Sequence, residues 1–114
     1  MEINEQSVYE YLTKTKAKNI ALIDLSKDKR LAKYMFLLTM SSCQENKKFA
    51  EQVISDFALE NQPEGYNKGE WIIIDLDEII IHSFIPSTRE KYNLDKLWQN
   101  KKIDIVKQSK KSKK

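Results

Sequence analysis

Apolar residues recur at helical spacing in two parts of the chain. Near the start, Val8, Tyr11 and Leu12 follow the i, i+3, i+4 pattern, which indicates a short amphipathic helix over residues 7–14. Asn4 precedes this segment and is a candidate N-cap, because its side-chain oxygen can accept from a free backbone N–H of the first turn.

A longer amphipathic helix is predicted over residues 45–61, after the candidate caps Ser41 and Ser42. Its apolar stripe follows i, i+4 spacing and consists of Phe49, Ala50, Val53, Ile54, Phe57 and Ala58.

Four apolar runs are of strand length. Residues 19–25 indicate a buried strand, and residues 34–40 fit either a second buried strand or a short buried helix. We favour a strand for the second run because of its length and aromatic content. Residues 71–75 and 79–84 give the strongest signals, each with three consecutive β-branched residues. Only residues 76–78 separate them, which predicts an antiparallel hairpin.

The chain after the hairpin predicts two short helical segments. Pro86 stops the second strand of the hairpin, and Ser87 is a candidate cap for a short helix. Asn93 can cap a last turn that carries Leu97 and Trp98. The order of elements suggests an α/β (α+β) fold, with helices packed on a mixed β-sheet.

The predicted hairpin has two largely apolar faces. On its first strand, one face carries Trp71, Ile73 and Asp75. On its second strand, one face carries Ile80, His82 and Phe84. A small domain has few helices, so they can leave one face uncovered as a partner surface. The periodicity alone leaves open whether Trp71 belongs to that surface or to the core.

The charge is divided unevenly between the domain and its C-terminal end. Residues 101–114 hold seven Lys and one Asp, which leaves 13 basic and 16 acidic residues in residues 1–100. The chain is therefore divided into a domain at residues 1–100 and a basic tail at residues 101–114, which we expect to be disordered. The tail can contact RNA phosphates or act as a solubilising end, and the sequence leaves both open.

No export signal or membrane-spanning run is present, which favours a cytoplasmic protein without membrane contact. Cys43 is the one cysteine, so it cannot form an internal disulfide.

Catalytic chemistry finds little support. His82 is the one histidine, so a transition-metal site is not expected. Asp75 and Asp77 resemble the paired acids with which nucleotidyltransferases hold magnesium, and such an enzyme is the alternative hypothesis. The glycine-rich turn that those enzymes need is missing before Asp75, and the chain has two glycines in all, so phosphate-binding loops are excluded. We expect no catalytic residue, metal or cofactor.

One block of the sequence resembles a known family, the ribosomal silencing factors (RsfS, also called Iojap-like). The family pattern is roughly Glu-Gly, Trp, an apolar run, Asp, Gly-Asp, a second apolar run, His-x-Phe, Arg, Tyr and Leu-x-x-Leu-Trp. The matching residues here are Glu64, Gly65, Trp71, Asp75, His82, Phe84, Arg89, Tyr92, Leu94, Leu97 and Trp98. The likeness covers about residues 5–98. It departs at the hairpin turn, where Asp77 and Glu78 replace the usual Gly-Asp, and at residues 40–44, which replace a Gly-Thr-Ser-x-Arg segment.

The resemblance implies a nucleotidyltransferase-like sandwich without the catalytic residues. It implies a non-enzymatic factor that binds the large ribosomal subunit through its protein number fourteen. Such a factor blocks joining of the small subunit and represses translation when nutrients are short. The expected partner-binding residues are Trp71, Ile73, Asp75, Asp77, His82 and Phe84. Ribosomal RNA is a further candidate partner for the lysine-rich tail, and homodimerisation of the free protein stays open.

Overall fold

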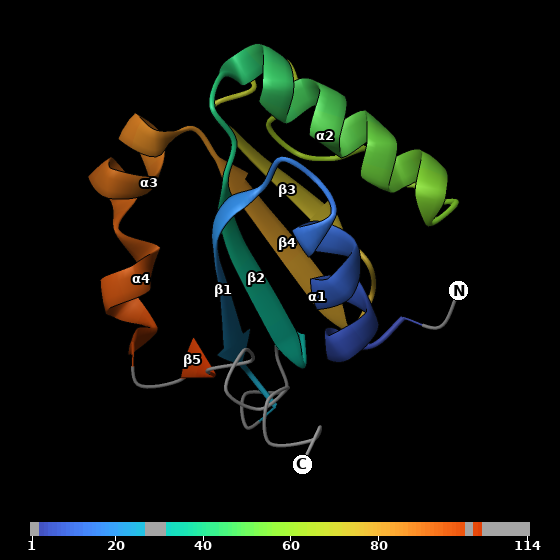
Figure 1. Cartoon of the computed structure of the whole chain (residues 1–114), viewed down its shortest axis with the longest axis vertical. Coiled ribbons are helices and arrows are strands. Elements are labelled where there is room, and N and C mark those ends of the chain that lie inside the picture. The colour runs from blue at the N-terminus through green and yellow to red at the C-terminus, as the bar shows by residue number, and fades with distance from the viewer. Residues whose placement is uncertain (1–2, 27–31, 100–101, 104–114) are drawn as a thin grey trace.

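In the computed structural model, one five-stranded sheet lies between two pairs of helices (Figure 1). The structure describes residues 3–26 and 32–99, together with the backbone of residues 102–103. The helices are α1 (Glu5–Thr13), α2 (Cys43–Asp56), α3 (Pro86–Tyr92) and α4 (Leu94–Leu97). The strands are β1 (Lys18–Asp24), β2 (Tyr34–Thr39), β3 (Trp71–Asp75), β4 (Ile79–Phe84) and β5 (Lys102–Ile103).

The sheet is mixed, as the sequence predicts, and its strand order is β3-β4-β2-β1-β5. β2 and β4 are parallel, whereas the β1–β2, β1–β5 and β3–β4 pairs are antiparallel. The run predicted as a strand over residues 34–40 forms β2, which lies at the centre of this sheet and ends at Thr39, and residues 35–40 are all buried. The predicted hairpin of β3 and β4 is confirmed with its predicted bounds.

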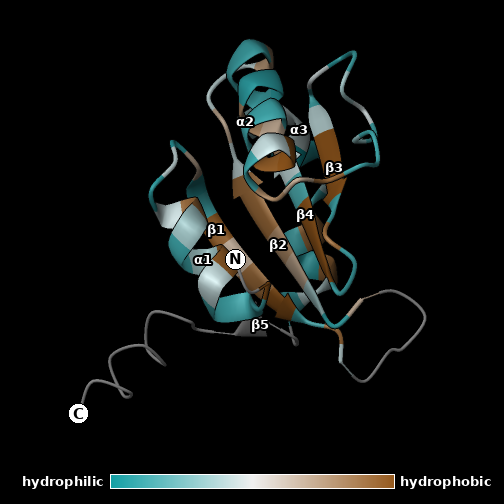
Figure 2. Ribbon diagram, turned by 90° about the vertical axis from the view of Figure 1, so that its right-hand side faces the viewer, coloured by the Kyte–Doolittle hydropathy of each residue, from teal (hydrophilic) through white to brown (hydrophobic). Residues whose placement is uncertain are grey.

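The sheet separates two hydrophobic clusters of different size. The larger cluster lies beneath α1 and α2 and includes Val8, Leu12, Phe49 and Val53 from these helices. Figure 2 shows the apolar strands behind α1 and α2, whose outer sides are polar. The smaller cluster lies on the opposite face of the sheet, where partly buried side chains of α4 pack on it. Helices therefore cover both faces of the sheet.

The helix ends agree with the predicted caps in three cases out of four. Asn4 caps α1, Ser42 caps α2 and Asn93 caps α4, each by accepting from a backbone N–H in the first turn. The predicted cap Ser87 is wrong, because α3 begins at Pro86 and Ile85 precedes it without a side-chain cap. Proline suits this first position, since its missing N–H has no partner there in any helix.

The α2 helix is shorter than predicted. The apolar stripe extends to Ala58, but the helix ends at Asp56 and Ala58 adopts a φ of 52°. Leu59 then packs against the larger cluster from outside the helix. The spacing of apolar residues could not predict the C-terminal end of α2, because the larger cluster buries apolar side chains both before and after that end.

A buried polar side chain joins α2 to the sheet. Asn46 is 0% exposed, and its side-chain amide donates to the carbonyl oxygens of Gly69 at 2.9 Å and Ser83 at 3.0 Å. Its side-chain oxygen accepts from the hydroxyl of Ser83, which is also 0% exposed. Every polar atom of this amide thus has a partner, as burial requires. The network fixes α2 relative to β4 and to the residue that leads into β3.

The outer edge of β3 is partly covered by the preceding loop. The backbone of Glu64 exchanges two hydrogen bonds with Ile73, at 3.0 and 2.9 Å. Gly65 follows with a φ of 78°, and a Cβ on it would lie 2.1 Å from the carbonyl oxygen of Trp71. Because glycine lacks a Cβ, Gly65 allows the loop to approach β3 more closely than any other residue type would at this position.

The opposite edge of the sheet is formed from the predicted tail. Lys102–Ile103 pair with Leu22 and Ile23 of β1, so a strand begins just after the predicted domain boundary at residue 100. The remaining tail lies outside the described residues. Within the described part of the chain, no helix has the length and apolar character to cross a membrane.

Candidate partner-binding face

Five of the residues on one side of the β3–β4 hairpin form a mixed apolar and polar surface. The register pairs Trp71 with Phe84, Ile73 with His82, and Asp75 with Ile80. Paired residues of an antiparallel ladder project to the same side of the sheet, so all six share one face. We call the members that reach the surface the Trp71 face: Trp71, Ile73, Asp75, Ile80 and His82.

Trp71 is held in place by aromatic neighbours. Its ring centroid lies 5.1 Å from that of Phe84 and 4.9 Å from that of Tyr92 on α3. Its indole N–H donates to Nδ1 of His82 at 2.9 Å. The indole is half-buried, so one side packs on the domain and the other is open. The structure thus places Trp71 between the two predicted roles of core residue and surface residue.

His82 supports the indole as a neutral imidazole. Burial lowers the pKa of His82 from its ordinary value of 6.5 to about 4. At neutral pH the ring carries no charge, and its Nδ1 is free to accept the indole N–H. This hydrogen bond orients Trp71, and the ring of His82 also stacks near Phe84 at 6.1 Å between centroids.

Phe84 differs from the other predicted site residues because it is only 1% exposed. It belongs to the smaller cluster, together with Met35, Leu37 and partly buried side chains that include Trp71. Phe84 therefore forms the floor beneath the indole and does not reach the surface of the face.

The prediction that helices cover only one side of the hairpin is wrong in part. α3 and α4 lie over this side of the sheet, and Leu94 and Trp98 pack on its smaller cluster (Figure 1). β3 is an edge strand, and its Trp71, Ile73 and Asp75 side chains stay partly or fully exposed. The surface left open is therefore smaller than a whole sheet face, and it is centred on the hairpin.

The hairpin turn preserves a conformation that normally requires glycine. Asp77 has a φ of 78°, in the left-handed region, and its backbone N–H donates to Oδ1 of Asp75 at 2.7 Å. Asp tolerates this region better than most residues because its short side chain is polar. In the family pattern that the sequence resembles, the usual Gly falls on Asp77. The positive φ of this residue explains why glycine suits the position.

The same turn changes the interpretation of the two acids as a magnesium pair. Asp77 lies outside β3, so the alternation that would align it with Asp75 does not extend to it. One oxygen of Asp75 is already used by the backbone of the turn. Among the described residues, no group of three or more His, Cys, Asp or Glu side chains could hold a metal ion. The geometry thus gives the nucleotidyltransferase alternative no added support.

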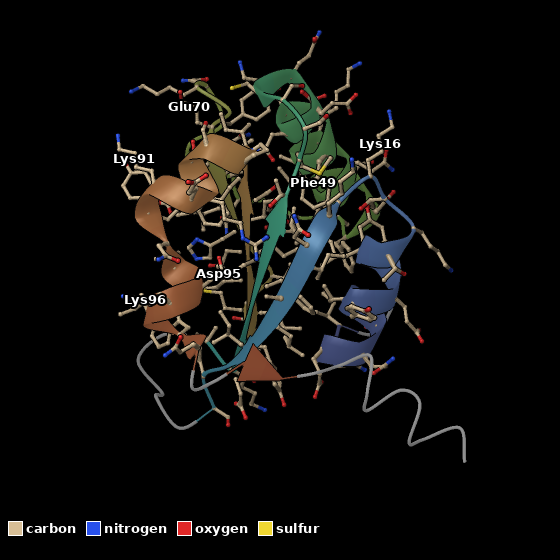
Figure 3. All side chains as sticks on the ribbon, turned by 60° about the vertical axis from the view of Figure 1, so that its left-hand side comes forward. Lys16, Phe49, Glu70, Lys91, Asp95 and Lys96 are labelled. Carbon is tan, nitrogen blue, oxygen red and sulfur yellow. The ribbon has the colours of Figure 1, made fainter. Side chains whose placement is uncertain are left out.

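An arginine that sequence reasoning did not single out as a site residue fixes the helices beside the face. Arg89 on α3 makes a two-pronged contact with Asp95 of α4, with its Nε and Nη2 atoms 3.0 and 2.8 Å from the carboxylate oxygens. Its Nη1 donates to the carbonyl oxygen of Asn19 and the hydroxyl of Thr39. Asp95 points from α4 towards the sheet in Figure 3. The signal in the sequence was the Arg of the family pattern, which falls on Arg89.

A hollow of about 550 Å³ adjoins the aromatic end of the Trp71 face. It is lined by residues of the loop before β3 and by Thr88 and Tyr92 of α3. Asp75 is an exposed acid of the face itself, and the exposed acids Glu70, Asp77 and Glu78 flank the two strands in the sequence. Figure 3 shows Glu70 pointing outwards at the end of the hairpin. The surface thus combines an apolar centre, a concave neighbour and an acidic border, which are features of a protein-binding site.

The fold and this site together define a small α/β domain with a partly exposed aromatic and aliphatic face at the edge of its sheet. The family model described as "Ribosomal silencing factor during starvation" (RsfS) matches residues 2–114. The chain belongs to this family. It is 31% identical over 108 residues to the ribosomal silencing factor RsfS of Chromobacterium violaceum, covering 90% of this chain and 88% of that protein. It is 30% identical over 88 residues to the RsfS of Bacillus subtilis, covering 73% and 74%.

One further relative, matched over a shorter stretch, and two solved structures are also similar to this chain. Over 41 residues the chain is 39% identical to the mouse protein named mitochondrial assembly of ribosomal large subunit protein 1, covering 36% of this chain and 18% of that one. The crystal structure of protein CV0518 from Chromobacterium violaceum superposes with a TM-score of 0.73 at 30% identity, over 87% of this chain and 88% of that one. A Bacillus halodurans structure has a TM-score of 0.70 at 21% identity, over 89% and 99%, and shows the shared fold. The predicted family and fold class are confirmed.

Proposed function

We propose that this chain binds the large ribosomal subunit through that subunit's protein number fourteen, using the Trp71 face. Bound there, it stands where the small subunit must join, and it represses translation when nutrients are limited. Family membership supports a role in silencing the ribosome. The mouse relative, whose name refers to assembly of the mitochondrial large subunit, supports the choice of subunit.

The half-buried indole of Trp71 is the observation that carries the proposal. Its hydrogen bond to His82 and its ring contacts orient it before any partner arrives. A side chain ordered in advance loses little conformational entropy on binding, and tryptophan is among the residues most often found at binding hot spots. Ile73 and Ile80 extend the apolar centre beside it.

The acidic border of the face suits a partner with a basic surface. Asp75, Asp77 and Glu78 lie together around the hairpin turn and are all exposed. Charges at the rim of an interface steer encounter and fix orientation more than they add affinity. The mechanism is steric throughout, so the function requires no turnover.

The test is to replace Trp71 with Ala and measure co-sedimentation with separated ribosomal subunits. Wild-type protein is expected to co-sediment with the large subunit and not with the small subunit. Its association with the large subunit is expected to be lost when the subunits join. The variant is expected to lose ~2 kcal/mol or more of binding free energy, about thirtyfold in affinity. Wild-type binding by the folded variant would remove the Trp71 face from the proposal.

Two further variants separate binding from folding. Asp75→Asn keeps a side-chain oxygen for the turn and removes only the exposed charge, so it should fold normally and weaken association modestly. Leu97→Ala removes an apolar side chain of α4 that is 70% exposed and lies outside the face. It should bind like wild type. If Trp71→Ala unfolds while Asp75→Asn and Leu97→Ala bind equally well, the face is not the docking site.

A further inference from the structure

One ring nitrogen of the Trp71 face has no partner in the part of the chain that the structure describes. His82 uses Nδ1 to accept the indole N–H of Trp71 at 2.9 Å, and no described residue bonds to its other nitrogen, Nε2. Among the described side chains, no nitrogen or oxygen atom is both buried and without a hydrogen bond. Nε2 is therefore accessible to solvent.

The indole determines which nitrogen of the imidazole carries the proton. A nitrogen that accepts a hydrogen bond is unprotonated, so Nδ1 carries no hydrogen. A neutral imidazole then carries its single hydrogen on Nε2. Burial lowers the pKa of His82 to about 4, so the neutral ring is the form present at pH 7. His82 thus exists as one tautomer, and its accessible nitrogen is a hydrogen-bond donor.

Apolar side chains flank this imidazole on the Trp71 face. Ile73 is the cross-strand partner of His82, and Ile80 lies two residues before it on the same side of β4. A partner that covers these partly exposed side chains also takes water away from the Nε2–H group. A desolvated donor costs free energy unless the partner supplies an acceptor. The face therefore selects for a partner that places an acceptor over His82.

The charge of the face favours a neutral acceptor over an anionic one. Asp75 is the one charged member of the Trp71 face, and its side chain is exposed. The face contains no Lys or Arg, so a carboxylate or phosphate placed on it would be repelled by Asp75 without compensation from a cation of the face. A peptide carbonyl has a strong acceptor and no net charge. A main-chain carbonyl oxygen therefore fits this position better than an acid does.

We propose that Nε2–H of His82 donates a hydrogen bond to a main-chain carbonyl oxygen of the protein that docks on the Trp71 face. The inference rests on the proposed function for the existence of that partner, and it names the polar contact that sets the partner's register. Trp71 then has two roles, since it supplies apolar contact and also fixes the tautomer of His82. The two hydrogen bonds of the ring strengthen each other, because bonds in series polarise the groups that they join.

The first experiment determines the tautomer in the free, full chain at pH 7. Long-range proton–nitrogen-15 NMR spectra distinguish the two ring nitrogens, and the chain has one histidine, so no assignment is needed. The proton is expected on Nε2. A spectrum with the proton on Nδ1 would overturn the proposal, because the donor would then be absent from the surface.

The second experiment measures the donor in the complex, without any substitution. Isolated large-subunit protein number fourteen is added to the labelled chain, and exchange of the Nε2–H proton with water is followed by NMR. A hydrogen bond to the partner should slow this exchange about tenfold or more, since the proton leaves the bond only when the contact opens. Unchanged exchange in the saturated complex would overturn the proposal.

Two substitutions of His82 compare the donor with the loss of the ring. His82→Gln can place an amide N–H near the position of Nε2, whereas the shorter His82→Asn reaches only the position of Nδ1. Both variants lose the ring, so their difference isolates the donor once circular dichroism shows that both are folded. His82→Asn should bind the large subunit about tenfold more weakly than His82→Gln. Equal affinities of the two folded variants would overturn the proposal.

Salt distinguishes a carbonyl oxygen from a charged acceptor. A bond to a neutral group is screened little, so the ratio of the two Kd values should be the same at about 0.05 M and about 0.3 M salt. A ratio that falls several-fold at the higher salt would indicate a carboxylate or an RNA phosphate and would overturn the choice of a carbonyl.

The inference and the proposed function can fail separately. Absence of wild-type co-sedimentation with the large subunit would overturn the proposed function, and this inference with it. Binding by wild type and loss of binding in Trp71→Ala, together with equal affinities of His82→Gln and His82→Asn, would overturn the inference alone.

Discussion

At the scale of single residues, the Trp71 face depends on the environment of one histidine. His82 is mostly buried, and no acid among the described residues stabilises its charged form, so burial favours the neutral ring. The neutral ring can accept the indole N–H of Trp71, whereas the doubly protonated ring cannot. Orientation of the proposed anchor is thus linked to the protonation state of His82.

This linkage predicts a pH dependence of stability. The folded-state pKa of His82 is lowered to about 4, so the unfolded chain binds the proton more tightly. Its contribution to stability is present above pH 6.5 and is lost as the pH falls to 4, by up to about 3 kcal/mol. Urea unfolding at pH 7 and pH 4.5 should show a smaller pH effect in His82→Gln, which keeps an acceptor but does not titrate. The same pH effect in both proteins would contradict this assignment.

Backbone conformation predicts opposite effects of two substitutions near the hairpin. Asp77 has a positive φ, so Asp77→Gly should stabilise the fold by about 1 kcal/mol through relief of steric strain. Gly65→Ala should destabilise it by about 3 kcal/mol, because the added Cβ would overlap the carbonyl oxygen of Trp71. Thermal unfolding measures both changes. A stable Gly65→Ala variant would show that the loop can move away from β3.

At the scale of elements, the contact between α2 and the sheet combines an apolar stripe with one buried amide. The stripe supplies most of the burial, through Phe49, Ala50 and Val53. Asn46 fixes the orientation of α2 on the sheet, because hydrogen bonds are directional. Its side-chain amide donates to the carbonyl oxygens of Gly69 and Ser83, and its side-chain oxygen accepts from the Ser83 hydroxyl. This network places the start of β3, and with it Trp71, relative to the rest of the sheet.

Removing the amide should therefore cost more than removing a surface side chain of the same helix. Asn46→Ala leaves the hydroxyl of Ser83 and two carbonyl oxygens without their partner in the core, which predicts a loss of about 3 kcal/mol. Ser55→Ala, at an exposed position of α2, is the control and should change stability little. Equal midpoints of urea unfolding in the two variants would show that the network contributes nothing.

At the scale of the whole molecule, the first residues of the basic C-terminal end belong to the sheet of the folded domain. Lys102–Ile103 extend the sheet at β1, whereas residues 104–114 carry five Lys and one Asp. A truncation that tests the role of the tail must therefore end after residue 103, so that the edge strand is kept.

Under the proposed function, this truncation has a modest effect on association with the large subunit. We expect a change in affinity of less than tenfold, about 1.4 kcal/mol, and a shallower dependence on salt. Co-sedimentation at two salt concentrations provides the measurement. Complete loss of association would contradict this prediction. It would indicate that the main contact with the large subunit is made by the tail to RNA and not by the Trp71 face.

The sequence by itself determined four of the five described strands, three of the four predicted caps, and the family, but not β5, which lies in the predicted tail. Runs such as residues 71–75 and 79–84 bury β-branched side chains whatever the fold around them, and a cap is a contact between neighbours in the chain. These features are local, so periodicity and residue type are enough to predict them.

The tertiary structure decided which side chains meet across the sheet. Asn46 and Ser83 are 37 residues apart in the chain, and Arg89 bonds to Asn19 across 70 residues. No periodicity records such pairs, because they depend on strand order and on the parallel pairing of β2 with β4. The same pairing buries Phe84 and leaves Trp71 half-buried. The proposed docking face therefore depends on long-range packing.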